Sequence, residues 1–165
     1  DPATGEIAWK TGAVLSMRSV SSPVFIDNLT FASCGSGGGG NYVVAIEAPP
    51  SGRGEAKVKY EVRRSAPYVP APIIHDGLAF LWSDGGIVTC IDARSGDEKW
   101  RERVGGNYFS SPILVDGRLY NVADDGKVAV LAAKDTFAVL GRSDFDEETR
   151  ATPAVAGGGM YFRTL

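Results

Sequence analysis

The sequence predicts an all-β fold made of repeated four-stranded antiparallel units, on three observations. A small residue followed by proline opens an apolar strand four times, and these prolines lie 49, 40 and 41 residues apart. Turn signals of the Asp-Gly type separate the short apolar strands between them. An Asp-x-x-x-Gly-x-x-x-Trp stretch occurs twice, at residues 1–9 and 92–100. Four short strands repeating about every 40 residues are typical of β-propeller blades.

The second unit, residues 71–110, gives the clearest set of elements. Asp76-Gly77 is a hairpin signal, because aspartate bonds its own turn backbone and glycine tolerates positive φ. Further turns are expected at 83–86 and 92–96. The strands between these turns are apolar on both faces, which favours sheets that are covered on both sides. The predicted strands are 71–75, 78–82, 87–91 and 98–104.

The third unit, residues 111–151, repeats this pattern with the same hairpin at Asp116-Gly117. Counting along the chain puts Ala132 where the second unit has its turn aspartate. Eight residues later, Leu140 is expected in the place of Trp100.

The first unit, residues 22–70, is looser than the other two. A glycine run, Gly35–Gly40, enlarges its second turn, and Ala48–Lys57 form an insertion rich in proline and glycine. Tyr60 is the candidate for the tryptophan place in this unit.

The two ends of the chain predict partial blades at 1–21 and 152–165. Together they supply three of the four strands of a blade, and the third strand is the missing one. We therefore expect a segment of a larger ring, with a small four-bladed ring as the alternative. An open arc would leave unpaired strand edges, so self-association of the isolated chain is expected.

The duplicated stretch has a structural interpretation. The aspartate can cap a tight turn, the glycine can take its left-handed residue, and the indole can wedge between neighbouring blades while its N–H finds a backbone carbonyl. This interpretation assigns blade docking, and no chemistry, to Asp1, Gly5, Trp9, Asp92, Gly96 and Trp100.

These residues resemble the tryptophan-docking repeats of quinoprotein-like propellers, the pyrroloquinoline-quinone-type repeat with the pattern Asp-x-x-[Thr/Ser]-Gly-x-x-x-Trp. The resemblance implies a ring of seven or eight blades and a periplasmic or extracellular location. The family includes quinone-dependent dehydrogenases, the periplasmic lipoprotein of the outer-membrane barrel assembly machine, and sensor domains attached to kinases.

Composition argues against some classes of binding partner. The chain has 17 basic and 20 acidic side chains, a balance that argues against nucleic acid as a partner. No apolar run approaches the ~18 residues of a membrane span. Cys34 and Cys90 leave two alternatives open, a disulfide or separate burial as small apolar residues.

Three motifs that could carry chemistry have plainer explanations. The glycine run leads into a strand and not a helix, so it predicts a flexible turn and not a phosphate loop. The acidic stretch 144–148 predicts a solvated connection, because it lacks the spacing of a calcium loop. His75, the only histidine, aligns with strand-end packing positions. We therefore expect no catalytic, cofactor-binding or metal-binding residue.

The best candidate binding surface is the set of connections between blades, at residues 18–22, 64–69, 105–110 and 147–151. Repeat geometry places them on one face of the ring, near its axis, where propeller ligands usually bind. The polar and aromatic candidates there are Tyr68, Asn107, Tyr108 and Arg150.

The sequence therefore predicts a non-catalytic propeller scaffold that binds a protein, a peptide or a small ligand. A fragment of a quinone-dependent dehydrogenase, holding pyrroloquinoline quinone with calcium, is the first alternative. The resemblance implies a pair of adjacent cysteines beside that cofactor, which this chain lacks, and Trp82 is the only tryptophan outside the docking motif. A sensory domain attached to a kinase or a membrane anchor is the second alternative.

Overall fold

The computed structural model describes residues 1–165 and contains strands as its only regular elements. It contains no helix that is long and apolar enough to cross a membrane. The strands are β1 (Trp9–Lys10), β2 (Val24–Ile26), β3 (Leu29–Cys34), β4 (Tyr42–Glu47), β5 (Gly54–Glu55), β6 (Lys57–Val62), β7 (Ile73–His75), β8 (Leu78–Trp82), β9 (Ile87–Asp92), β10 (Glu98–Arg103), β11 (Ile113–Val115), β12 (Arg118–Val122), β13 (Lys127–Ala132), β14 (Val139–Asp144), β15 (Ala154–Ala156) and β16 (Gly159–Tyr161). Three sheets have four antiparallel strands each, in the spatial orders β2-β3-β4-β6, β10-β9-β8-β7 and β11-β12-β13-β14.

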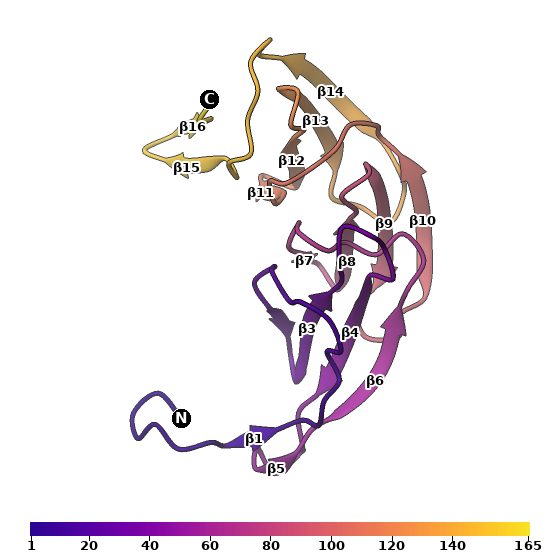
Figure 1. Ribbon diagram of the computed structural model, residues 1–165, viewed down its shortest axis with the longest axis vertical. Coiled ribbons are helices and arrows are strands. Elements are labelled where there is room, and N and C mark those ends of the chain that lie inside the picture. Colours follow the sequence, from indigo (N-terminus) through magenta and orange to yellow (C-terminus); the bar gives the residue numbers. More distant parts are fainter.

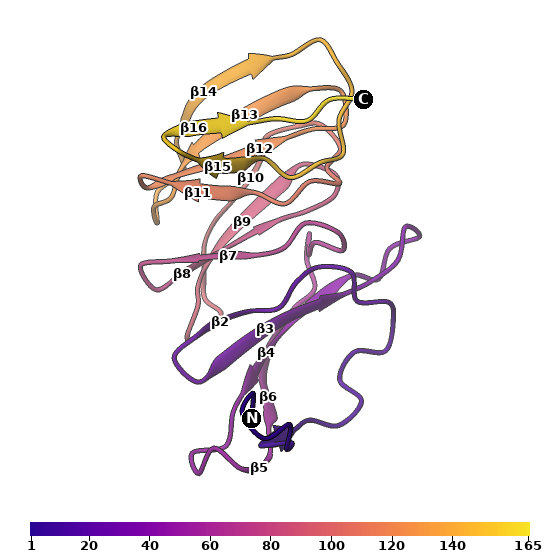
Figure 2. The ribbon, with the colours of Figure 1, turned by 90° about the vertical axis from the view of Figure 1, so that its left-hand side faces the viewer.

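The sheets are stacked face to face along an open arc (Figure 1). The short first strands and the β15-β16 hairpin lie on the concave side, and β6, β10 and β14 form the convex side. The view from the concave side shows the sheets one above another along the long axis (Figure 2). This is the arrangement of propeller blades around an axis, and it confirms the fold class predicted from the repeat.

The two end segments do not join into one blade. Strand β1 pairs in parallel with β5, which lies inside the expected insertion 48–57, and β15 pairs only with β16. The alternative of a small closed ring would need β1 beside β16. Instead, the arc is open between the two ends (Figure 1).

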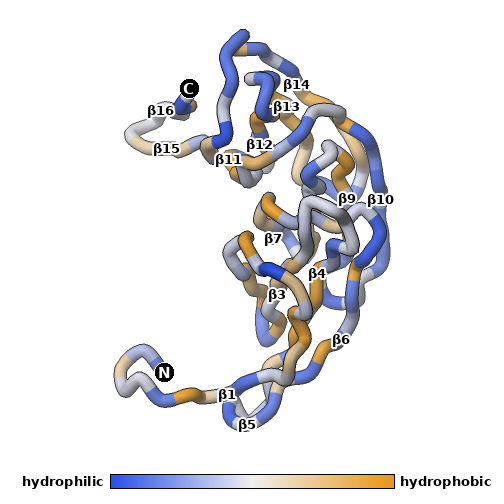
Figure 3. The backbone as a smooth tube through the Cα atoms, in the orientation of Figure 1, coloured by the Kyte–Doolittle hydropathy of each residue, from blue (hydrophilic) through white to orange (hydrophobic).

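Each central strand buries both of its faces, which explains the continuous apolar runs in the sequence. In β8, Phe80 and Trp82 point into the cluster shared with the third sheet, whereas Ala79 and Leu81 point into the cluster shared with the first. The apolar segments accordingly lie inside the arc, and β10 on the convex side is hydrophilic (Figure 3). Adjacent sheets thus bury each other's surface, which is the main source of stability in such a stack.

The two cysteines occupy separate clusters. Cys34 is buried between the first sheet and the N-terminal segment, and Cys90 between the second and third sheets. Both are free thiols, so of the two alternatives the structure shows separate burial. Burial raises the pKa of Cys90 to about 12, and a neutral buried thiol of this kind is inert.

A row of hydroxyl groups links the first strands of neighbouring sheets near the axis. Two of the residues that precede a strand-opening proline carry these hydroxyls: Ser111 Oγ accepts the N–H of Ala71 at 2.9 Å, and Thr152 Oγ1 accepts the N–H of Ser111 at 2.9 Å. Ala71 has no hydroxyl, so it cannot accept a side-chain hydrogen bond from the preceding unit. The small residue that recurs before proline in the sequence is therefore an inter-sheet contact.

Candidate functional site

The two Asp…Gly…Trp stretches form the same turn. Asp92 Oδ1 accepts the N–H groups of Arg94 and Ser95, both at 2.9 Å, and Gly96 N donates to Asp92 O at 2.9 Å. The bonds from the Ser95 and Arg94 N–H groups hold the pKa of the Asp92 carboxyl below its usual value. The turn that begins at Asp1 is closed in the same way, because Gly5 N donates to Asp1 O at 2.8 Å.

The tryptophan at the end of the second stretch contacts the next sheet. Trp100 Nε1 donates to Lys134 O at 2.9 Å, and the indole packs edge-on against Phe137 with ring centroids 5.2 Å apart. Trp9 likewise packs on the cluster of the first sheet. The stretch therefore joins sheets.

Tyr60 occupies the tryptophan place of the first unit. It lies opposite Ala45 as Trp100 lies opposite Cys90, and its hydroxyl donates to Ala93 O of the next sheet at 2.6 Å. Gly96 makes room for the ring, because a Cβ there would lie 2.8 Å from Tyr60 Cδ2.

The equivalent place in the third unit is Gly141, and the expectation of Leu140 was wrong. Val130, the counterpart of Cys90, lies opposite Gly141, because the turn between β13 and β14 is one residue longer than the turn between β9 and β10. Leu140 is 52% exposed. The third sheet thus carries no aromatic docking residue in β14.

The connections between sheets lie on one face and are tied to the loops between second and third strands. Gly35 N donates to Arg18 O at 2.9 Å, and Asp124 N donates to Asn107 O at 2.8 Å. Thr149 N donates in turn to Asp124 O at 3.1 Å. These bonds fix the positions of the loops that surround the candidate surface.

A cavity of about 360 Å³ opens on this face, and it is lined by loops of all three sheets and by the connections between them. Three of the four residues proposed from the sequence meet there. Its lining consists of Gly37, Tyr68, Val69, Asp84, Gly85, Asn107, Tyr108, Phe109 and Asp124.

The proposed residues differ in how they face this cavity. Asn107 is exposed and Tyr68 half-buried, whereas Tyr108 is only 3% exposed and packs edge-on against Trp82 with ring centroids 5.2 Å apart. Tyr108 is thus chiefly a core residue. Arg150 lines an adjoining cavity with Asp124, Asp125 and Glu148, and its guanidinium lies 4.9 Å from the ring centroid of Phe109.

Asp84 and Asp124 occupy the same repeat position but differ in their contacts. The Asp84 carboxylate accepts the N–H groups of Tyr68 at 2.7 Å and Val69 at 3.0 Å, and so fixes the wall of the cavity. The carboxylate of Asp124 has no such bond, and it borders both cavities. The carboxylate of Asp84 in the second sheet is therefore engaged by backbone N–H groups, whereas that of Asp124 in the third sheet is free to bind another group.

Asp84→Asn is expected to lower the free energy of unfolding by about 1–2 kcal/mol, because one charged acceptor for two backbone N–H groups is lost. Asp124→Asn, the matched change without these bonds, should alter it by less than about 0.5 kcal/mol. Urea unfolding of both variants measures the difference. Equal losses would show that the Asp84 contacts contribute nothing.

Burial raises the pKa of Tyr108 to about 12 from 10.0. Since the folded state holds this proton more tightly, the contribution to stability is fully present below pH 10 and is lost as the pH rises from 10 through 12. Tyr108 should therefore contribute about 2–3 kcal/mol to the loss of stability at alkaline pH. In Tyr108→Phe, this part of the pH dependence should vanish.

Sequence reasoning missed Asp84, Phe109 and Asp124. Asp84 lies in the turn expected at 83–86, and Asp124 lies in the matching turn of the third unit, so nothing but their shared repeat position could have singled them out. Phe109, which is 45% exposed, follows Tyr108 directly and is the residue of the pair that faces out.

The glycine run, His75, the acidic stretch 144–148 and Trp82 lie in turns, at strand ends or in the core. The glycine run leads into β4 as expected, and Gly37 contributes only backbone to the cavity wall. His75 Nε2 lies 3.3 Å from Asp76 Oδ2 at the end of β7. No three histidine, cysteine or acidic side chains, those of 144–148 included, gather in metal-ligand geometry. Trp82 is fully buried in the core.

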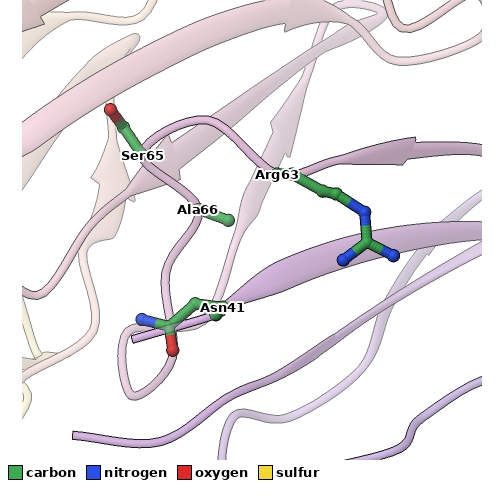
Figure 4. Close-up of a pocket in the computed structure, with 5 residues that line it drawn as sticks. Asn41, Arg63, Ser65 and Ala66 are labelled. Carbon is green, nitrogen blue, oxygen red and sulfur yellow. The ribbon is translucent and has the colours of Figure 1, made fainter. Parts of the chain in front are cut away.

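A second cavity, of about 310 Å³, lies beside the glycine run, but its side chains do not converge. Figure 4 shows Arg63 and Ser65 pointing away from each other. Arg63 is engaged by Glu61 at 2.6 Å, and Asn41 Oδ1 accepts the N–H of Ser36 at 3.0 Å. The cavity lined by Tyr68 and Phe109 is the better candidate.

A comparison with known protein families agrees with this fold. The model of the family described as outer membrane protein assembly factor BamB matches residues 1–139. The chain belongs to this family. Its repeat is the quinoprotein-like one that the docking stretches indicated.

Solved structures share the fold of this family member at low identity. BamB from Moraxella catarrhalis aligns with a TM-score of 0.72 and 18% identity, over 95% of this chain and 46% of that one. Quinohemoprotein alcohol dehydrogenase from Comamonas testosteroni aligns with a TM-score of 0.64 and 15% identity, over 84% and 23%. At such identities the likeness concerns the fold.

A curated relative has higher sequence identity over a shorter stretch. Serine/threonine-protein kinase AfsK from Streptomyces griseus is 33% identical, over 54% of this chain and 12% of the kinase. The chain thus spans less than half the length of each of these proteins.

Proposed function

We propose that this chain is part of a non-catalytic propeller scaffold, in the periplasm or outside the cell, that binds a protein, peptide or small ligand on its connection-bearing face. The carrying observation is the cavity between Tyr68 and Phe109, whose wall is fixed by the Asp84 carboxylate. A pre-formed cavity with few convergent polar groups suits recognition. Membership of the BamB family supports a protein partner.

Selection of displayed peptides on the immobilised chain tests this proposal. Binding of the enriched peptides should fall at least about tenfold in Phe109→Ser, because the exposed wall of the cavity is lost. Asp116→Asn, a turn substitution on the opposite face, should leave binding unchanged. Peptides that bind both variants equally well would place recognition elsewhere.

A sensory domain attached to a kinase is the second candidate, favoured by the 33% identity to AfsK. The full-length gene tests it: a kinase domain encoded in the same chain would support this role. The dehydrogenase alternative has a direct test as well. Adding pyrroloquinoline quinone with calcium should leave the visible absorption of the quinone unshifted, and a shift would favour the enzyme.

Self-association of the chain remains part of the proposal. Large apolar side chains are exposed on and around the last sheet and hairpin, and such surfaces drive association when they are contiguous. Light scattering should show the apparent mass rising with concentration, and a monomer at high concentration would contradict this. The exposed residues are Val139, Leu140, Phe145, Val155 and Tyr161.

A further inference from the structure

The charge of the cavity points to the chemistry of its ligand. Its charged lining residues are two carboxylates, Asp84 and Asp124, and no lysine or arginine lines it. The adjoining cavity adds Glu148 and Asp125, of which Asp125 is paired with Lys127, beside one lining cation, Arg150. Asp84 is engaged by backbone N–H groups, so the free acceptor is Asp124. A cationic group would complement this surface.

The aromatic walls suit the same kind of group. Both rings already attract guanidinium groups of the chain itself: Arg150 lies 4.9 Å from the centroid of Phe109, and Arg18 lies 5.8 Å from the centroid of Tyr68. Neither arginine lines the cavity between the rings. Cations over aromatic faces gain about 0.5–2 kcal/mol, depending on desolvation.

A third group adds hydrogen bonding. The exposed Asn107 is fixed by its backbone oxygen, which accepts the N–H of Asp124. Its side-chain amide makes no hydrogen bond, and Asn107 lines the cavity together with Asp124. The cavity thus offers two aromatic walls, a free carboxylate and an amide oxygen, all held on bonded loops.

We propose that this cavity receives the side chain of an arginine or lysine from a partner polypeptide. The inference rests on the proposed scaffold function and names the chemistry of its partner. The cation would lie between Tyr68 and Phe109 and donate to Asp124 and Asn107. The volume of about 360 Å³ lies in the range of ~300–1,000 Å³ usual for ligand pockets.

Saturation-transfer NMR with three acetylated and amidated tripeptides, Gly-Arg-Gly, Gly-Glu-Gly and Gly-Leu-Gly, tests this inference. The method reads the small peptide, so self-association of the chain does not obscure it. The arginine peptide should show the strongest transfer, centred on its side-chain protons. Asp124→Asn should weaken its binding about five- to tenfold, through loss of a charged acceptor.

The control is Asp135→Asn, the same charge change at an exposed turn on the opposite face, which should leave binding unchanged. Stronger transfer to the glutamate or leucine peptide, sensitive to Phe109→Ser, would overturn the inference and leave the scaffold function standing. Absence of transfer to all three, together with no selected peptides, would overturn both. Equal weakening by the two asparagine variants would show nonspecific electrostatics and would also overturn it.

Discussion

Gly86→Ala is expected to destabilise the chain by about 3 kcal/mol or more, since positive φ and backbone overlap both penalise it. Gly86 has φ 72°, and an added Cβ would lie 2.3 Å from Gly105 O and 2.8 Å from Gly106 O. These are backbone atoms, so no side chain can rotate away. Gly86 is also bonded to this connection through its own carbonyl, which accepts the N–H of Val104 at 2.9 Å.

The neighbouring residue supplies the control for this prediction. A Cβ on Gly85 would meet no atom within 4 Å, so Gly85→Ala should change the free energy of unfolding by less than about 1 kcal/mol. Urea unfolding followed by tryptophan fluorescence compares the two variants. Similar midpoints would mean that the close approach of the β8-β9 loop to the following connection contributes little.

Trp100→Ala should be the second large effect, with a loss of about 3–5 kcal/mol. The indole is 9% exposed, lies between Phe80 and Phe137, and donates to Lys134 O. Removing it leaves a void between the second and third sheets. Trp100→Phe retains most of this packing and loses the hydrogen bond, so about 1 kcal/mol of the loss in Trp100→Ala should be attributable to that bond.

Leu140→Ala serves as the comparison, because it also truncates a large apolar side chain in an outermost strand. Because 52% of the surface of Leu140 is exposed, the loss in the free energy of unfolding should stay below about 1 kcal/mol. Denaturant unfolding of all three variants gives the ranking Trp100→Ala, Trp100→Phe, Leu140→Ala. If Leu140→Ala matched Trp100→Ala, the docking role of the indole would be contradicted.

The strand order within each blade was predictable because its determinants are local. Asp76-Gly77 and Asp116-Gly117 specify hairpins by their own turn chemistry, and the apolar runs specify strands covered on both faces. The pairing of β1 with β5 was not predictable, since its two partners lie far apart in sequence. Counting residues likewise misplaced Leu140, because one added turn residue shifts the register of β14.

The candidate site was predictable in position but not in detail. Repeat geometry alone brings Tyr68 and Asn107 to one face. Which of two consecutive aromatic residues points outward depends on backbone direction in a loop, so Phe109 was overlooked in favour of Tyr108. Whether a turn aspartate binds its neighbours or stays free depends on the next connection, which distinguishes Asp84 from Asp124.

The row of hydroxyl groups near the axis bears on how such a chain can grow by gene duplication. Ser111 donates its N–H to Thr152 and accepts the N–H of Ala71. A unit that has both the hydroxyl acceptor and the backbone N–H donor at this position can be copied in tandem. Each copy then meets an N–H donor from the unit on one side and a hydroxyl acceptor from the unit on the other. Blade number can therefore change by whole units without leaving a polar group unpaired, and the unit that begins at Ala71, which has no hydroxyl, carries only one half of this contact.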